Sequence, residues 1–185
     1  MVGAKTRKVF ISFHHRDEVY KTRFARIMDG NIVDKSVEDG DIDSSNNTDR
    51  IRRIIRDNFI ADATVTVVLI GECTWQRKHV DWEVGSSLRD TSKNPRCGLL
   101  GILLPTHPDY GRREYNPRLM PPRLADNLRG SSPYAAIHDW TDNPVSVKGW
   151  INAAFGRISR QPDPDNTRDQ FGKNRSGPCS AGWQD

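Results

Sequence analysis

The sequence predicts a three-layer α/β fold, in which helices cover both faces of a central five-stranded parallel sheet. Two observations indicate this. Short apolar, β-branched runs alternate with segments whose apolar residues recur at helical spacing, as in repeated strand–helix–strand units. Two of the runs, 63–71 and 97–105, are apolar at almost every position, which is typical of strands covered on both faces.

The N-terminal third contains two predicted strands with a helix between them. The strands are expected at 9–13 and 31–34. The helix, ending near residue 29, is indicated by apolar residues at helical spacing: Tyr20, Phe24, Ile27 and Met28. A polar loop follows, rich in Asp, Ser, Asn and Gly. Asn47 or Thr48 can then cap a helix whose apolar positions are Ile51, Ile54, Ile55 and Phe59.

The remaining elements continue the alternation. The run 63–71 is the strongest strand, and a helix marked by Val80, Val84 and Leu88 follows it. The strand 97–105 ends at a proline. A long polar stretch, with one short helix near 124–128, leads to a fifth strand at 134–140 and a closing helix over 147–158. Five strands in this arrangement fit the flavodoxin-like order 2-1-3-4-5.

The chain divides into one domain, residues 7–160, and a C-terminal segment, residues 161–185. The segment is polar, rich in Pro, Gly and Asp, and shows no hydrophobic periodicity. Such a composition buries too little apolar surface to offset the entropy of ordering. We therefore expect a disordered or loosely attached tail.

Composition indicates a cytoplasmic protein. No apolar run approaches the roughly 20 residues that span a bilayer, and the first residues lack the apolar centre of a signal peptide. Cys73, Cys97 and Cys179 are an odd number without metal-ligand spacing, which argues for a reducing compartment and against a disulfide framework. We expect no contact with membranes.

The net charge of +4 includes one dense basic patch, formed by Arg50, Arg52, Arg53 and Arg56. Such a patch can contact phosphates, or it can be the solvated side of a helix whose other side is isoleucine-rich. No aromatic residues interleave with these arginines, and no nucleic-acid-binding motif accompanies them. We favour the solvated helix and expect no nucleic-acid partner.

The predicted topology places a ligand site between the first and third strands. In doubly wound sheets, ligands bind beyond the carboxyl ends of the strands, where the strand order reverses. The loops at that point are 14–17, with sequence HHRD, and 71–77. The polar loop after the second strand lies close beside them.

The groups required by several well-known sites of this fold class are missing. The third strand ends in VLIGECTW without the Asp of a phosphorelay receiver, and SFHHRDEV lacks the glycines of a flavin phosphate loop. G-x-G-x-x-G, the P-loop pattern and H-E-x-x-H do not occur, and the five histidines show no ligand spacing.

A different candidate is Glu83, which lies between Val80 and Val84 at the margin of the apolar side of its helix. A carboxyl group there is partly desolvated, so its pKa should rise, and it can face the cleft. His79 is one turn earlier on the same side. The alternative is a surface glutamate paired with Arg77 or Arg89, and position alone favours that alternative.

Several motifs together resemble a TIR domain. They are KVFISFHHRD, the Ser/Asp-rich loop after NIVD, the strand ATVTVVLIG, and a tryptophan followed after seven residues by Glu83. TWQRKHVDWEV, ILLP, PPRLADN and AIHDW are similar to the bacterial TIR-like branch that includes the Thoeris antiphage defence protein. The resemblance covers residues 8–158. Its loop, SVEDGDIDSSNN, lacks the usual central proline, so assembly through that loop does not follow.

The resemblance implies an enzyme that takes NAD+ as substrate, with no bound cofactor or metal. Enzymatic TIR domains cleave the bond between nicotinamide and ribose, and Glu83 matches their catalytic glutamate. In Thoeris the product is a cyclic or modified ADP-ribose that activates a downstream effector protein. Two other functions stay open: a non-catalytic scaffold acting by self-association, and a sensor that holds ADP-ribose without cleaving it.

Residues near the expected cleft are candidates for substrate binding. Ser12 and His14 are placed to contact ribose or phosphate. Phe13 and Trp75 are equally suited to stacking on a base and to core packing. For Asp17, we favour a role as the N-cap of the first helix.

Three further substrate-side candidates are Asp34 and Ser36, which begin the loop that borders the substrate in TIR domains, and His79. His15 is expected to be exposed rather than functional.

Overall fold

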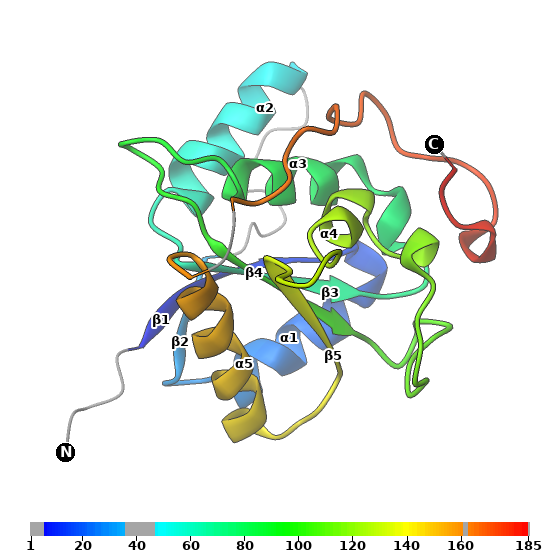
Figure 1. The fold of residues 1–185 in the computed structure, drawn as a ribbon, viewed down its shortest axis with the longest axis horizontal. Coiled ribbons are helices and arrows are strands. Elements are labelled where there is room, and N and C mark those ends of the chain that lie inside the picture. Colours follow the sequence, from blue (N-terminus) through cyan, green and yellow to red (C-terminus); the bar gives the residue numbers. More distant parts are fainter. Residues whose placement is uncertain (1–5, 36–46, 161–162, 185) are drawn as a thin grey trace.

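The computed structural model describes residues 6–35, 47–160 and 163–184. Its parallel strands are β1 (Arg7–Ser12), β2 (Ile32–Asp34), β3 (Val65–Ile70), β4 (Gly98–Leu103) and β5 (Ala135–Asp139). They lie in the order β2-β1-β3-β4-β5, which confirms the predicted fold class and strand order (Figure 1).

The helices form the two outer layers. They are α1 (Glu18–Ile27), α2 (Thr48–Ile54), α3 (Lys78–Ser87), α4 (Pro122–Asp126) and α5 (Pro144–Arg157). Helices α1 and α5 cover one face of the sheet, and α2, α3 and α4 cover the other (Figure 1). Each helix packs its apolar stripe against the face of the sheet that it covers. In the described ranges, no helix is long and apolar enough to cross a membrane.

The centre of the sheet determines where the site lies. Strand β3 is buried along its whole length, with β1 on one side and β4 on the other. Ser12, the last residue of β1, pairs with Val68, so β3 continues two residues beyond it to Ile70. The loops after β1 and β3 consequently leave the sheet side by side.

Helix α2 begins as expected and then changes character. The side chain of Asn47 accepts the Arg50 N–H at 2.9 Å, which identifies the cap. The helix continues as a π-helical turn, Ile55–Ile60, whose first and last residues are buried beside β1.

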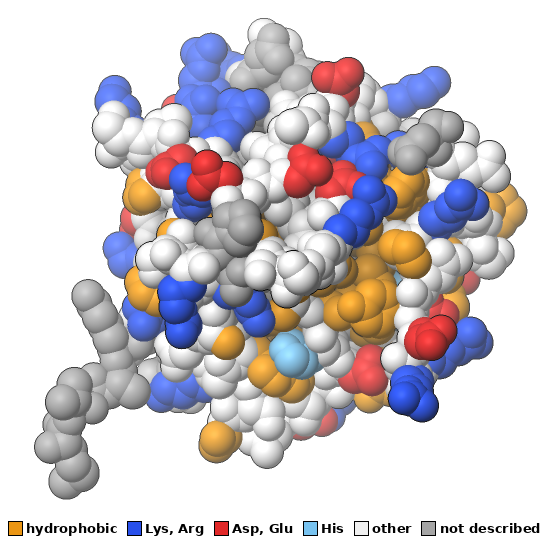
Figure 2. All heavy atoms as spheres, in the orientation of Figure 1, with side chains coloured by type: hydrophobic (Ala, Val, Ile, Leu, Met, Phe, Trp, Pro, Cys, Tyr) orange, Lys and Arg blue, Asp and Glu red, His pale blue; other side chains and the backbone are white. Residues whose placement is uncertain are grey.

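The basic patch on α2 has the character of a solvated helix face. Arg50 and Arg53 are exposed, and Arg56 pairs with Asp57 at 2.6 Å. Lys and Arg side chains gather over α2 at the top of the view in Figure 2.

The C-terminal segment differs from the expected disordered tail. Residues 163–184, which we call the strap, pack along α3 and α4 (Figure 1). Phe171 and Trp183 are 8% and 4% exposed. The Trp82 indole donates to the Phe171 carbonyl at 2.8 Å, and the Trp183 indole donates to the Met120 carbonyl at 2.9 Å. Two isolated aromatics thus anchor a polar segment, which periodicity cannot detect.

A buried ion pair joins α3, α4 and the strap. Arg123 and Asp81 are 1% and 2% exposed, and Arg123 Nε donates to Asp81 Oδ1 at 3.1 Å. Arg123 also donates to Asn166 Oδ1 at 2.7 Å and to the Arg168 carbonyl at 2.8 Å. Asp81 Oδ2 accepts the Phe171 N–H at 2.8 Å. Each charge is therefore compensated by partners, which a buried pair requires.

A disulfide between Cys73 and Cys179 ties the loop after β3 to the strap. The cysteine pattern was interpreted as evidence against a disulfide framework, and for Cys73 and Cys179 that interpretation is wrong. Three cysteines still allow one bridge, and Cys97 remains free and buried. The pairing depends on where the strap lies, which sequence spacing does not indicate.

Removing this bridge is expected to lower the free energy of unfolding. The cysteines are 106 residues apart, and a cross-link over a long loop restricts the unfolded chain strongly. We expect a loss of about 2–4 kcal/mol in the Cys73→Ser/Cys179→Ser protein, measured by urea unfolding. A dithiol reductant should shift the wild-type midpoint similarly and leave the double variant unchanged. An unshifted wild-type midpoint would show that the bridge does not stabilise the fold.

Candidate functional site

The candidate site is built where β1 ends against α3. Val80 and Val84 hold α3 on the sheet, and Glu83 lies between them on the same side. Ser12 Oγ donates to Glu83 Oε2 at 2.6 Å. The two residues are 0% and 9% exposed, so this contact is shielded from water. Glu83 is not the surface glutamate of the alternative interpretation, and within residues 6–35, 47–160 and 163–184 it makes no ion pair.

The environment of Glu83 favours the neutral acid. Burial raises the pKa of Glu83 to about 8, although the Ser12 hydrogen bond acts in the opposite direction. At neutral pH the carboxyl group is therefore largely protonated in the free protein. A cation arriving beside it would favour the carboxylate, because an opposite charge lowers the pKa. The site is thus suited to a ligand that is cationic at its reacting atom.

His14 lies beyond Ser12 and is also buried, with 2% of its surface exposed. Its Nδ1 accepts the Arg16 backbone N–H at 3.2 Å, so a neutral ring carries its proton on Nε2. Burial, and then the nearby Arg77, lower the pKa of His14 to about 4. The imidazole is therefore neutral at physiological pH and offers an N–H donor.

Asp17 does not cap the first helix with its side chain, contrary to expectation. Its carboxyl group accepts the Thr106 hydroxyl at 3.2 Å instead. It also packs against Gly71, where an added Cβ would lie within 2.2 Å of Asp17 Oδ2. Burial raises the pKa of Asp17. Asp17 therefore joins the loops after β1, β3 and β4.

Comparison with known proteins identifies the family. Residues 10–109, which include Ser12 and Glu83, match the sequence model of the family described as "Thoeris protein ThsB, TIR-like domain". The chain belongs to this family, which acts in antiphage defence. No curated protein matches the chain.

Among solved structures, this TIR-like domain is similar to the TIR domains in "Structure of the activated Roq1 resistosome directly recognizing the pathogen effector XopQ". The sequences are 13% identical, 83% of this chain and 84% of that chain are covered, and the TM-score is 0.38.

The two aromatic candidates of the TIR-like domain pack into the apolar clusters on the two faces of the sheet. Phe13 is half-buried and packs on the α1 and α5 side of the sheet, because neighbouring strand residues point to opposite faces. Trp75 is 2% exposed, and its indole donates to the Cys179 carbonyl at 2.8 Å. Of the two roles considered for Trp75, the structure therefore shows core packing.

The other predicted site residues are peripheral or lie outside the described ranges. His79 is exposed on α3 and meets the Trp82 ring edge-on. Asp34 is exposed at the end of β2, with its carboxylate 3.3 Å from Lys21 Nζ. Ser36 lies outside the described residues. His15 is exposed, as expected.

Sequence reasoning missed two arginines of this region, Arg16 and Arg77. Arg16 Nη1 lies 3.7 Å from Cys73 Sγ. Burial, and then the nearby Arg16, lower the pKa of Arg77. The two guanidiniums are therefore neighbours. Their position at the ends of adjacent strands was the available signal, but each resembles an ordinary surface arginine in the sequence.

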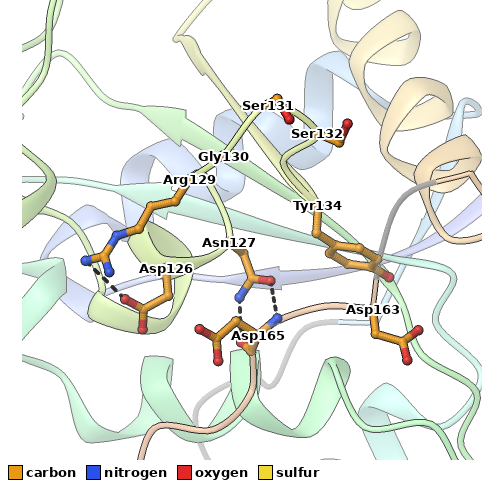
Figure 3. A pocket seen from close by; sticks show the side chains of 9 residues that line it. All are labelled: Asp126, Asn127, Arg129, Gly130, Ser131, Ser132, Tyr134, Asp163 and Asp165. Atoms are coloured by element: carbon orange, nitrogen blue, oxygen red, sulfur yellow. Dashed lines mark hydrogen bonds and ion pairs between the residues drawn. The ribbon is translucent and has the colours of Figure 1, made fainter.

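A separate hollow lies at the opposite end of the strands from Ser12. Figure 3 shows it lined by Asn127, Tyr134, Asp163 and Asp165, among others. Tyr134 precedes β5, so this hollow is at the amino end of the strands, whereas Ser12 is at a carboxyl end. The Asn127 side chain exchanges two hydrogen bonds with the Asp165 backbone, at 2.7 and 2.9 Å. The hollow is a junction between the strap and the α4–β5 loop, and it contains none of the predicted site residues.

Proposed function

We propose that this TIR-like domain cleaves the bond between nicotinamide and ribose in NAD+, with Glu83 as the reacting carboxylate. The observation that supports this most strongly is the buried Glu83, held by Ser12 at the switch point of the sheet. A buried carboxyl group with a raised pKa is typical of functional sites.

The chemistry requires little more than a positioned negative charge. The C–N bond breaks, its electron pair leaves with neutral nicotinamide, and positive charge develops on the ribose ring. The Glu83 carboxylate stabilises that charge in a water-poor site, where electrostatic interactions are strong. Water or a hydroxyl of the same molecule then forms the new bond at the ribose carbon, and its proton passes to the carboxylate.

The proposal extends to signalling. The product is a cyclic or modified ADP-ribose, and its receptor is a downstream effector protein. Membership of the Thoeris TIR-like family and the resemblance of the sequence to its TIR-like branch support both parts of this proposal. A cytoplasmic location fits a substrate that is an intracellular nucleotide, although the Cys73–Cys179 disulfide removes the cysteine argument for a reducing compartment.

The test is to identify what the protein makes from NAD+. Extracts of phage-challenged cells containing the full chain are incubated with NAD+, and nicotinamide and ADP-ribose derivatives are separated by chromatography. Equal amounts of both products, absent from cells without the protein, are expected. Intact NAD+ throughout, together with defence that persists, would instead support the scaffold function.

A further inference from the structure

Two buried nitrogen atoms in the loops after β1 and β3 have no hydrogen-bond partner among the described residues. They are Nε2 of His14 and Nε of Arg77. A buried donor without an acceptor is costly, so such groups usually have a partner in the functional state. Both atoms are donors here, because Nδ1 of His14 already accepts the Arg16 N–H. The missing partner is therefore an acceptor.

The same region carries positive charge that the described residues do not hold in ion pairs. Over the described parts of the chain, neither Arg16 nor Arg77 forms an ion pair. The carboxyl groups of Asp17 and Glu72 lie near each other and near Arg16, but neither is within ion-pair distance of the two guanidiniums. Glu83 is shielded from water and bonded to Ser12. Two unpaired guanidiniums and a neutral imidazole donor are the groups that bind phosphate oxygens in proteins.

We propose that His14, Arg16 and Arg77 form a binding site for a diphosphate group. Two guanidiniums match a group with two negative charges better than a monovalent anion, and the His14 N–H supplies a third donor. As the diphosphate of a dinucleotide substrate, the ligand rests on the proposed function. The same donors would also take free pyrophosphate, and the experiment separates these two sources.

Calorimetric titration of the full chain at low ionic strength tests the site. The probes are inorganic pyrophosphate, ADP-ribose, and adenosine as a ligand without phosphate. Arg16→Gln and Arg77→Gln are each expected to weaken pyrophosphate and ADP-ribose binding about tenfold, and the double variant more. Arg26→Gln, which removes an equal charge from an exposed position on α1, should bind like the wild type. If the Arg77→Gln protein does not fold, the double variant is made instead as Arg77→Lys with Arg16→Gln.

The outcomes separate this site from the proposed reaction. Pyrophosphate and ADP-ribose binding that is equal in the wild type and the double variant, or absent from both, overturns the site. Loss of pyrophosphate binding alone supports an anion site but contradicts its use for the dinucleotide. Arginine-dependent binding in a protein that never cleaves NAD+ supports the site and rejects the reaction. If the double variant cleaves NAD+ with an unchanged KM, the reaction is supported and the diphosphate site is rejected.

Discussion

Replacement of Glu83 by glutamine should slow nicotinamide release from NAD+ about 10²–10³-fold, the usual cost of losing one preorganised electrostatic contact. Glutamine keeps the size of the side chain and an oxygen that can accept the Ser12 hydroxyl, now 2.6 Å from Glu83. It cannot become negative as charge develops on the ribose. The change should therefore lower kcat more than it alters KM.

Glu72→Gln is the matched control for this variant. Glu72 is exposed on the loop after β3, and its replacement makes the same Glu-to-Gln change without touching the buried carboxyl group. The rate of nicotinamide release should be measured for both variants in the same challenged-cell extract. Equal rates in Glu83→Gln and the wild type would remove Glu83 from the reaction.

The second large effect is on stability. Arg123→Ala is expected to lower the free energy of unfolding by about 3–5 kcal/mol, because it leaves Asp81 charged and buried without its partner. The strap also loses the hydrogen bonds that Arg123 donates to Asn166 and to the Arg168 carbonyl. Urea unfolding followed by circular dichroism measures the change.

Arg129→Ala provides the comparison for that prediction. Its guanidinium lies 3.3 Å from Asp126 Oδ1, but the side chain is 63% exposed, so the pair is worth at most about 1 kcal/mol. Similar losses in the two variants would mean that the Arg123–Asp81 pair is not the buried link between α3, α4 and the strap.

The sheet could be predicted because its signals are local. Strands β3 and β4 are uninterrupted apolar runs, and the helix positions repeat at helical spacing. The strap could not be predicted in this way. Phe171 and Trp183 are single aromatics in a polar segment, and their burial depends on surfaces that α3 and α4 create only after folding.

The candidate site shows the same division. The position of Glu83 follows from the helical pattern, and its importance was implied by the resemblance to TIR domains. Its contact with Ser12 joins residues 71 positions apart and depends on the strand order. The prediction that the Asp17 side chain caps the first helix was wrong, because Thr106 approaches this side chain from the loop after β4. Long-range neighbours of this kind leave no periodic trace in the sequence.

The pH dependence of kcat/KM for NAD+ cleavage tests the central claim most directly, since this ratio reports the pKa values of the free enzyme. Burial raises the pKa of Glu83 to about 8, and the reaction needs the carboxylate. We expect kcat/KM to increase with pH below this value, by about tenfold per unit, and to level off above it. A ratio that is constant across this range, or that falls as Glu83 ionises, would exclude the Glu83 carboxylate as the reacting group.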